Sequence, residues 1–343
     1  MIQKNRGAAL ITVLIIVLII MSIITDITIK NYRVIRRLTN QKAMEQCYGI
    51  LFAAADFGRA GLATSAATST IDSITDIWAQ PIPRTKVIDD IYMSGYIIDE
   101  QGKFNINDLV SNGQVNQTVL TQFTALLTSL NLPTALAPAI AYYMAAPQYE
   151  TDIMNQYTNA DPRYRPAGKP LVDLAELKLI KGMQPEYEYK LANYITAIPV
   201  SITGQLMAES AAANAQESTT NSNKTLAPPT GPGVIQVNVN TASAEVIAAK
   251  SGIPLPVANR IVSVRENTPF KASTDIQSFL ASNGIITSQS NSNMNLTTLT
   301  TNSTYFTIHA AVDKGDYEFK WVELVYRANR TGQWPLILWH HPE

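Results

Sequence analysis

The feature that most limits what this chain can fold into is an uncharged apolar run near its amino terminus, GAALITVLIIVLIIMSIIT over residues 7–25. A helix of this length and composition is long enough to cross the hydrocarbon core of a bilayer. Lys4 and Arg6 precede the run, as in a secretory signal peptide, but no small-x-small cleavage site follows it. The run therefore predicts a membrane-spanning helix over residues 8–25 that is not removed at its carboxyl end.

Helical periodicity continues beyond the apolar run. Apolar residues recur at three- and four-residue intervals as far as Ala55, and no proline occurs before Pro81. We therefore expect one helix from about Ala9 to about Ala60, within an amino-terminal segment of residues 8–62, with a length of about 75–80 Å. Cys47 is the single cysteine, so an internal disulfide is excluded, and we expect it to be a small apolar residue on this helix.

Charge counting around the span leaves the topology open. Only Lys4, Arg6 and the amino group precede it, whereas five basic residues follow it: Lys30, Arg33, Arg36, Arg37 and Lys42. Taken alone, the positive-inside rule would place the body of the protein in the cytoplasm. The net charge of the whole chain is −1, so no global positive field steers it toward nucleic acid.

Strand patterns lie on both sides of a long helical region. Around Ile91–Ile98, apolar residues alternate with polar or small ones ahead of Glu100-Gln101-Gly102, which predicts two strands joined by a hairpin turn at residues 100–102. The segments TYFTIHAAV, DYEFKWVELVYR and WPLILWH predict an antiparallel meander at the carboxyl end. The sequence therefore predicts an α+β fold, with a sheet domain built from residues 63–107 and 300–343.

The residues between these strands predict a large inserted all-α domain. Helical spacing and proline or glycine punctuation divide it into a first helical module, residues 108–200, and a second, residues 234–285, both of the helix-hairpin-helix or SAM-like kind. In the first module, Asp173 and Glu176 predict a capped helix that Gly182 closes. Residues 201–233 and 286–303 are polar and aperiodic, and we expect them to form loops.

An internal echo supports two similar modules. FNINDL (Phe104–Leu109) and VNVNTA (Val237–Ala242) share an apolar-Asn-apolar-Asn pattern ahead of a helical run. Asparagine is a preferred residue at helix amino termini. We therefore expect Asn107 and Asn240 to be N-caps.

The stretch AAKSGIPLPVANRIVSVR (Ala248–Arg265) has the outline of a helix-hairpin-helix, a unit known for binding nucleic-acid backbones. Such binding uses free backbone amides in the hairpin, and Pro254 removes one of them. The nearby positive charges are few: Lys250, Arg260, Arg265 and Lys271. We therefore expect the hairpin to serve helix packing, and a membrane-anchored DNA-binding receptor of the competence type is the alternative.

Catalytic and metal-binding patterns are missing from the sequence. It contains no Walker A, G-x-G-x-x-G, G-x-S-x-G or H-E-x-x-H motif. Its three histidines are His309, which we expect to be structural on a strand, and the adjacent pair His340 and His341. Neighbours on a strand point to opposite faces, which does not suit chelation of one metal. We expect no enzyme, and an enzyme of unrecognised type is a third alternative.

The amino terminus, KNRG followed by AALITVLIIVLII, resembles a type IV prepilin leader. In that family a membrane peptidase cuts after the glycine and methylates the new amino terminus. The resemblance implies a leader of residues 1–7, cleaved between Gly7 and Ala8, and an uncleaved single-span anchor is the alternative. Most pilins carry glutamate at the fifth mature position, where this chain has Thr12.

The order of motifs along the body resembles the minor pseudopilin K family of bacterial type II secretion, also called general secretion pathway protein K, which characteristically lacks that glutamate. GKFNINDL and VNVNTASAEVIAAKSGI resemble the starts of that family's two helical modules. FKWVELVYRANRTGQWPLILWH resembles its last strands in a pilin-like sheet domain. The resemblance touches nearly the whole chain apart from the polar loops.

The resemblance implies a structural protein of the secretion pseudopilus and no enzyme. The chain would lie in the inner membrane with its body in the periplasm, and it would help to start assembly from the pseudopilus tip. Its partners would be minor pseudopilins of the I and J types, with the H type as a further candidate, together with the prepilin peptidase and the inner-membrane assembly platform. Nucleic acid is not among them.

The resemblance implies no cofactor except calcium, which many pilin-like proteins hold. Relatives place aspartates after a helix of the first module, where this chain reads AYYMAAPQYETD and offers Glu150 and Asp152. Calcium takes six or more oxygen ligands, several of them carboxylate. The sequence favours solvated surface acids at these two positions and leaves calcium binding open.

Overall fold

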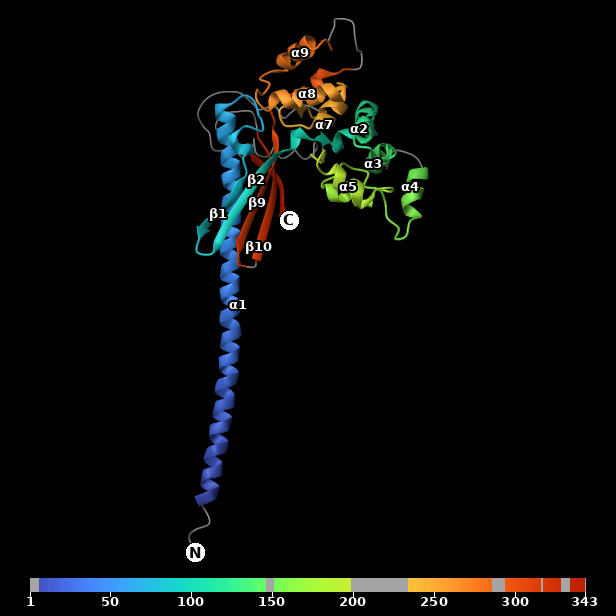
Figure 1. Ribbon diagram of the computed structural model, residues 1–343. Coiled ribbons are helices and arrows are strands. Elements are labelled where there is room, and N and C mark those ends of the chain that lie inside the picture. The colour runs from blue at the N-terminus through green and yellow to red at the C-terminus, as the bar shows by residue number, and fades with distance from the viewer. Residues whose placement is uncertain are drawn as a thin grey trace, which may run out of the picture.

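The long amino-terminal helix is the axis of the molecule. In the computed structural model, which describes residues 6–145, 151–198, 234–285, 294–315, 317–327 and 334–342, α1 (Arg6–Thr68) is one continuous helix, blue in Figure 1. Its 63 residues correspond to a length of about 95 Å. The predicted single helix is confirmed, but it continues past the expected end near Ala60. Leu62 is fully buried against Trp78 and Phe306, and such tertiary packing extends a helix beyond its local preference.

A five-stranded antiparallel sheet packs against the carboxyl half of α1 (Figure 1). Its order is β1-β2-β9-β10-β11. The strands are β1 (Ile82–Ile88), β2 (Ile91–Asp99), β9 (Tyr305–Lys314), β10 (Tyr317–Tyr326) and β11 (Leu336–Pro342). Gly58 lets the helix approach β9 closely, because a Cβ atom there would lie 2.8 Å from a methyl carbon of Ile308. The predicted α+β class and the carboxyl-terminal meander are confirmed.

The predicted hairpin at residues 100–102 is wrong. β2 instead pairs with the preceding β1 through a turn at Asp89 and Asp90, and Asp89 has φ 44°. Residues Glu100–Gly102 form the short 3-10 helix η2, in which the Asp99 carboxylate accepts a hydrogen bond from the Gln101 amide. This local cap ends β2 and directs the chain out of the sheet. The turn-like sequence at residues 100–102 is therefore the point where the chain leaves the sheet and not a hairpin.

Between β2 and β9 the chain forms a block of helices that projects from the top of the sheet (Figure 1). Its α-helices are α2 (Gln117–Ser129), α3 (Leu136–Ala145), α4 (Thr151–Thr158), α5 (Pro185–Leu191), α7 (Ala244–Ser251), α8 (Leu255–Arg265) and α9 (Ser273–Ser282). Short 3-10 helices are η3 (Ile106–Leu109), η4 (Leu174–Leu179) and η5 (Leu296–Thr298), and η1 (Ile77–Ala79) follows α1.

The block is not purely helical, which corrects the expectation of an all-α insertion. β3 (Phe104–Asn105) pairs in parallel with β6 (Ile195–Thr196), and β7 (Val237–Asn238) pairs in parallel with β8 (Leu299–Thr300). A third pair, β4 (Val110–Ser111) with β5 (Gln114–Val115), is antiparallel. Each parallel pair brings the start and end of one stretch of helices together, which matches the internal echo in the sequence.

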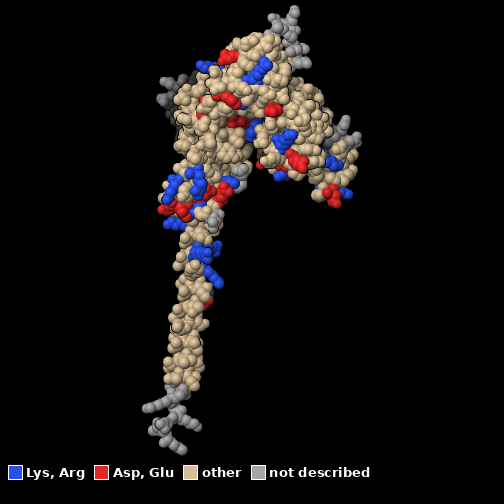
Figure 2. All heavy atoms as spheres, viewed as in Figure 1, with Lys and Arg blue, Asp and Glu red and all other residues tan. Residues whose placement is uncertain are grey.

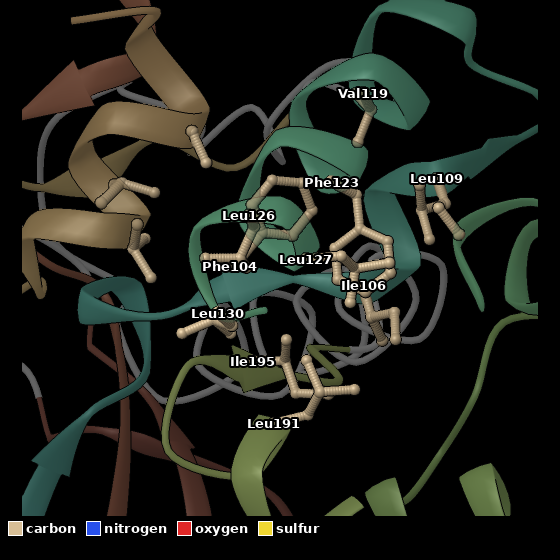
Figure 3. Close-up of a cluster of buried hydrophobic side chains, with 14 of the residues drawn as sticks. Phe104, Ile106, Leu109, Val119, Phe123, Leu126, Leu127, Leu130, Leu191 and Ile195 are labelled. Carbon is tan, nitrogen blue, oxygen red and sulfur yellow. The ribbon is translucent and has the colours of Figure 1, made fainter. Parts of the chain in front are cut away.

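One hydrophobic core runs through the whole block. It joins residues from β3 and α2 to residues from α7 and α8. Figure 3 shows its centre, where α2 and β3 lie above side chains of α5 and β6. The labelled residues are Phe104, Ile106, Leu109, Val119, Phe123, Leu126, Leu127, Leu130, Leu191 and Ile195. Because the core is shared, the two stretches of helices support one another.

The predicted capping box at Asp173 is confirmed. The Asp173 side chain accepts from the Ala175 amide, and the Glu176 carboxylate accepts from the Asp173 amide. The capped element η4 is a 3-10 helix rather than an α-helix, and Gly182 follows it with φ 88°. Of the remaining expectations, residues 1–5 of the leader, the loop at 201–233, positions 286–293 and Glu150 lie outside the described residues. The described part of the predicted loop at 286–303 is not irregular throughout, because it contains η5 and β8.

The prediction that Asn107 and Asn240 are N-caps is wrong, because both side chains are buried clamps. The Asn240 amide accepts from the Phe270 N–H and donates to the Phe270 carbonyl, both at 2.9 Å. Asn107 does the same to the N–H and carbonyl of Leu171, at 2.8 and 2.9 Å. The N-caps are Asn116 for α2 and Ser243 for α7. The echo therefore marks two equivalent clamps on an extended chain segment.

We expect Asn240→Ala to lower the free energy of unfolding by about 3 kcal/mol, because it leaves the buried N–H and carbonyl of Phe270 without partners. For a body of this size the melting temperature should fall by roughly 6–12 °C. Thermal unfolding of the full chain in detergent, followed by circular dichroism, measures the change. Asn259→Ala, at an exposed position of α8, is the matched control, and equal melting temperatures for the two variants would contradict the clamp.

Candidate assembly interface

The amino-terminal part of α1 stands free of the body. From Leu10 to Leu38 every residue of the helix is exposed, and Figure 2 shows the stem as a long uncharged column with charges only toward the body. The helix is long and apolar enough to cross a membrane, with mean hydropathy 2.9 over its most apolar window. Within this segment the hydroxyl groups of Thr25 and Thr28 donate to the carbonyls of Met21 and Ile24, so they are satisfied inside the helix.

The predicted processing residues lie at the start of this helix. Gly7, Ala8 and Thr12 are all in its first two turns, and Thr12 is exposed. Threonine is uncharged, so position 12 places no carboxylate in the apolar part of the helix.

The upper half of α1 carries a second exposed apolar surface. Cys47 is buried between α1 and the sheet, as expected for a small apolar residue, and burial raises the pKa of its thiol. Next to this packed face, Gly58 and Gly61 line an apolar groove of about 120 Å³ between α1, η1 and β2. Ile77 and Phe57, which are 84% and 62% exposed, stand at its rim. Two small residues between large exposed ones form a surface that can receive side chains of another subunit.

The hairpin between α7 and α8 uses its cations internally. The Lys250 ammonium lies 2.9 Å from the Asp108 carboxylate and 4.6 Å from the Phe104 ring centre, and its side chain is fully buried. The Arg265 guanidinium is also buried and donates to the carbonyls of Val239 and Ala242. Two of the four basic residues near the hairpin are therefore unavailable to a phosphate backbone, and the hairpin packs helices together.

A buried polar network joins the helical block to the sheet. The Asn238 amide of β7 donates to the Asp72 carbonyl, the Asp99 carboxylate and the Ser303 hydroxyl, at 3.0, 3.1 and 2.9 Å. Asp72 forms a buried ion pair with Arg327, whose guanidinium also donates to the Ser303 carbonyl. Residues from the segment after α1, from β2, from the block and from the position just after β10 thus meet at one point.

Asp99 is the buried carboxylate of this network without a cation of its own. Burial raises its pKa from 3.8 to about 6, although hydrogen bonds from Ser303 and Thr241 lower it in part. Burial also raises the pKa values of Asp72 and Asp108, against the attraction of Arg327 and Lys250. These groups connect parts of the fold that are far apart in sequence.

Sequence reasoning missed the Asp99 network and also the buried Lys250–Asp108 pair, although one signal for the pair exists. Val246, Ile247 and Lys250 recur at helical spacing, so the lysine shares the buried face of α7 with two apolar residues. A lone charge on an apolar face predicts a buried partner. The partner, Asp108, is 142 residues away in sequence, and no local pattern identifies it.

The histidines lie on strands, as expected. His309 of β9 stacks on Tyr96, with ring centres 4.5 Å apart. His340 lies against Trp321 and His341 stacks on Trp339. In the part of the chain that the structure describes, no three His, Cys, Asp or Glu side chains are grouped so as to hold a metal ion.

The pKa of Asp99 predicts a pH-dependent stability. Because its folded pKa of about 6 exceeds 3.8, the folded state binds the extra proton, and stability is lost as pH rises through about 6. From this residue alone the free energy of unfolding should be about 2 kcal/mol lower at pH 7 than at pH 4. Denaturant unfolding should show a weaker pH slope for Asp99→Asn than for the natural chain. Asp90→Asn, at an exposed turn, should keep the natural slope, and an unchanged slope for Asp99→Asn would contradict the assignment.

Comparison with known proteins agrees with this architecture. Two family models, both described as type II secretion system protein K, match residues 102–200 and 237–298. The type II secretion system protein K of Pseudomonas aeruginosa is 26% identical over 296 residues, which cover 82% of this chain and 79% of that protein. A chain in the crystal structure of the GspK-GspI-GspJ complex from enterotoxigenic Escherichia coli has the same fold, with TM-score 0.62 and 17% identity. The alignment covers 90% of this chain and 99% of that one.

The family models match both stretches of helices, the Pseudomonas relative extends over most of the chain, and the solved structure has the same fold over 90% of this chain. These are the features that the motif order indicates in the sequence. The chain belongs to the type II secretion system protein K family, whose members are minor pseudopilins.

Proposed function

We propose that this minor pseudopilin occupies the tip of the pseudopilus and helps to start its assembly. The observation that carries the proposal is the position of the helical block, which lies at the end of the body farthest from the amino terminus and projects to one side (Figure 1). Subunits of a helical filament repeat the same contact along one axis. A block of this size above the sheet leaves no room for another subunit above this one. The subunit at the tip of the filament has no neighbour above it, so the block fits there.

Thr12 supports the same position. In pilins generally, the glutamate at the fifth mature position is thought to pair with the amino terminus of a neighbouring subunit inside the membrane, where an unpaired charge is costly. A chain with an uncharged residue at this place has no such requirement to dock beneath an earlier subunit. The proposal therefore makes this chain the first subunit in, with later subunits added below it.

The proposed location is the inner membrane, with α1 as a single span and the body in the periplasm. The proposed partners are the I- and J-type minor pseudopilins, since the solved structure with this fold is a complex of those three proteins. The H type, the prepilin peptidase and the assembly platform are further proposed partners. The role is structural, without a cofactor or nucleic acid, and calcium binding near Glu150 and Asp152 stays a prediction.

We expect the prepilin peptidase to cleave between Gly7 and Ala8, because the basic leader ends in glycine directly before the apolar helix. Gly7→Leu should block processing by filling the peptidase site with a bulky side chain. Intact mass measurement of the protein from peptidase-competent cells gives the result. Ala9→Leu, two residues on, is the matched control and should still be processed. Retention of Met1 in the natural chain would exclude the cleavage.

We expect the bodies of the three minor pseudopilins, each lacking its membrane span, to form a complex with one copy of this chain. The groove beside α1 is the proposed contact. Phe57→Asp places a charge at its apolar rim and should weaken the complex by about 30-fold, as for a central interface residue. Calorimetric titration and native mass spectrometry measure affinity and stoichiometry.

Tyr189→Asp is the control for this variant, because Tyr189 is 81% exposed but lies in α5, away from the groove. It should leave the affinity unchanged. Equal weakening by both substitutions would show that the groove is not the contact. Labelling of this chain along whole filaments, rather than at one end, would overturn the tip position itself.

A further inference from the structure

Four basic residues form one stripe on α1 between the membrane span and the body. We call Lys30, Arg33, Arg36 and Arg37 the basic stripe; all four are exposed. At about 100° per residue they lie within an arc of about 120° on one side of the helix. Figure 2 shows basic side chains on the stem just below the body, above a stretch without charge.

The continuous helix fixes the distance of the stripe from the membrane. Lys30 and Arg37 follow Thr25, the last residue of the apolar run, by roughly 7 and 18 Å along the axis. The head-group layer extends about 5–8 Å beyond the hydrocarbon core on each side. Long lysine and arginine side chains lean toward such a layer. The stripe therefore begins in the head-group layer and continues just above it.

The stripe has little acidic compensation within the protein. Lys30 pairs with Asp26 at 2.7 Å, with both side chains largely exposed. Among the described residues, no acidic side chain lies within ion-pair distance of Arg33, Arg36 or Arg37. The sheet first packs on α1 at Cys47, about 15 Å further along the helix than Arg37. The positive charge thus faces outward, toward whatever surrounds the stem.

The opposite side of the same segment is apolar. Ile27, Val34, Ile35 and Leu38 lie there and are all exposed, and Tyr32 is exposed at the edge of the stripe. One basic side, one apolar side and an aromatic residue between them are the features of a helix segment at a membrane surface. Charge complementarity at this depth points to the negative phosphates of the lipid rather than to the body of another subunit.

We propose that the basic stripe binds the phosphate groups of anionic phospholipids at the membrane face on the side of the body, and so sets the depth and rotation of α1 in the bilayer. The attraction acts within a Debye length of the surface and weakens with salt. It does not depend on the tip position, since it is a property of the single chain in a bilayer.

The test uses the full chain reconstituted alone in phosphatidylcholine bilayers that contain spin-labelled phosphatidylglycerol or spin-labelled phosphatidylcholine. Electron paramagnetic resonance gives the fraction of each label held at the protein surface, and hence the ratio of the two association constants. We expect phosphatidylglycerol to associate about fivefold more strongly at low salt. In the Arg33→Gln, Arg36→Gln, Arg37→Gln triple variant, and at high salt, the ratio should approach one.

The matched control carries the same loss of charge on the body, as Arg163→Gln, Arg165→Gln and Lys190→Gln at exposed positions; it should keep the preference. Equal association of the two lipids with the natural chain, or a preference retained by the stripe variant, would overturn the proposal. A natural chain without lipid preference, combined with a stripe variant that no longer joins the I- and J-type partners, would assign the stripe to an acidic subunit surface instead.

Discussion

The attachment of the helical block depends on the side-chain amide of Asn238, which reaches three oxygen atoms of the sheet domain. The β7–β8 pair holds the Asn238 backbone, and the Asn238 side-chain oxygen accepts a hydrogen bond from the backbone N–H of Asn240. The acceptors come from the segment after α1, from the end of β2 and from the segment before β9. Hydrogen bonds in a buried site are directional, so they fix an orientation that apolar contact alone would leave free.

The same amide ties two different kinds of packing together. Below it, α1 and the sheet have small apolar clusters around Leu51 and Leu62. Above it, the block has a continuous core of its own. Neither cluster below extends into the core above, so the junction is polar where the two meet. These directional hydrogen bonds hold the large helical block in a fixed orientation on α1 and the sheet.

The sequence predicts the parts of this fold that depend on local periodicity. The long helix, the meander at the carboxyl end, the Asp173 capping box and the place of Cys47 as an apolar residue of the helix all follow from spacing or composition and are confirmed. The hairpin at residues 100–102 was misplaced because the same turn-forming residues can also end a strand. Asn107 and Asn240 were recognised as a pair, yet their contacts with distant backbone segments are not encoded in the residues beside them.

The residues of the candidate interface also divide into those that the local sequence predicts and those that only the fold brings together. Gly7, Ala8 and Thr12 were found from a short motif at one end of the chain. The groove at Gly58 arises only where α1, β2 and β9 come together. The network at Asp99 arises only where β2 meets β7 of the block and the segments that follow α1 and precede β9. Lys250 is the clearest case: in the sequence it was counted only as a positive charge near the hairpin, whereas its place on the apolar face of α7 indicates burial.

The neighbours β2 and β9 are paired in the sheet, yet Asp99 and its partner Phe306 are separated by the whole helical block. Closing a flexible loop of about 200 residues costs several times RT, and the cost grows with the logarithm of its length. Once the block has formed its own core, the hydrogen bond from Gln101 to the Gln236 carbonyl and the β7–β8 pair hold the two ends of this loop close together. The block then acts as a preformed short connection for the sheet, which turns a distant pairing of strands into a local one.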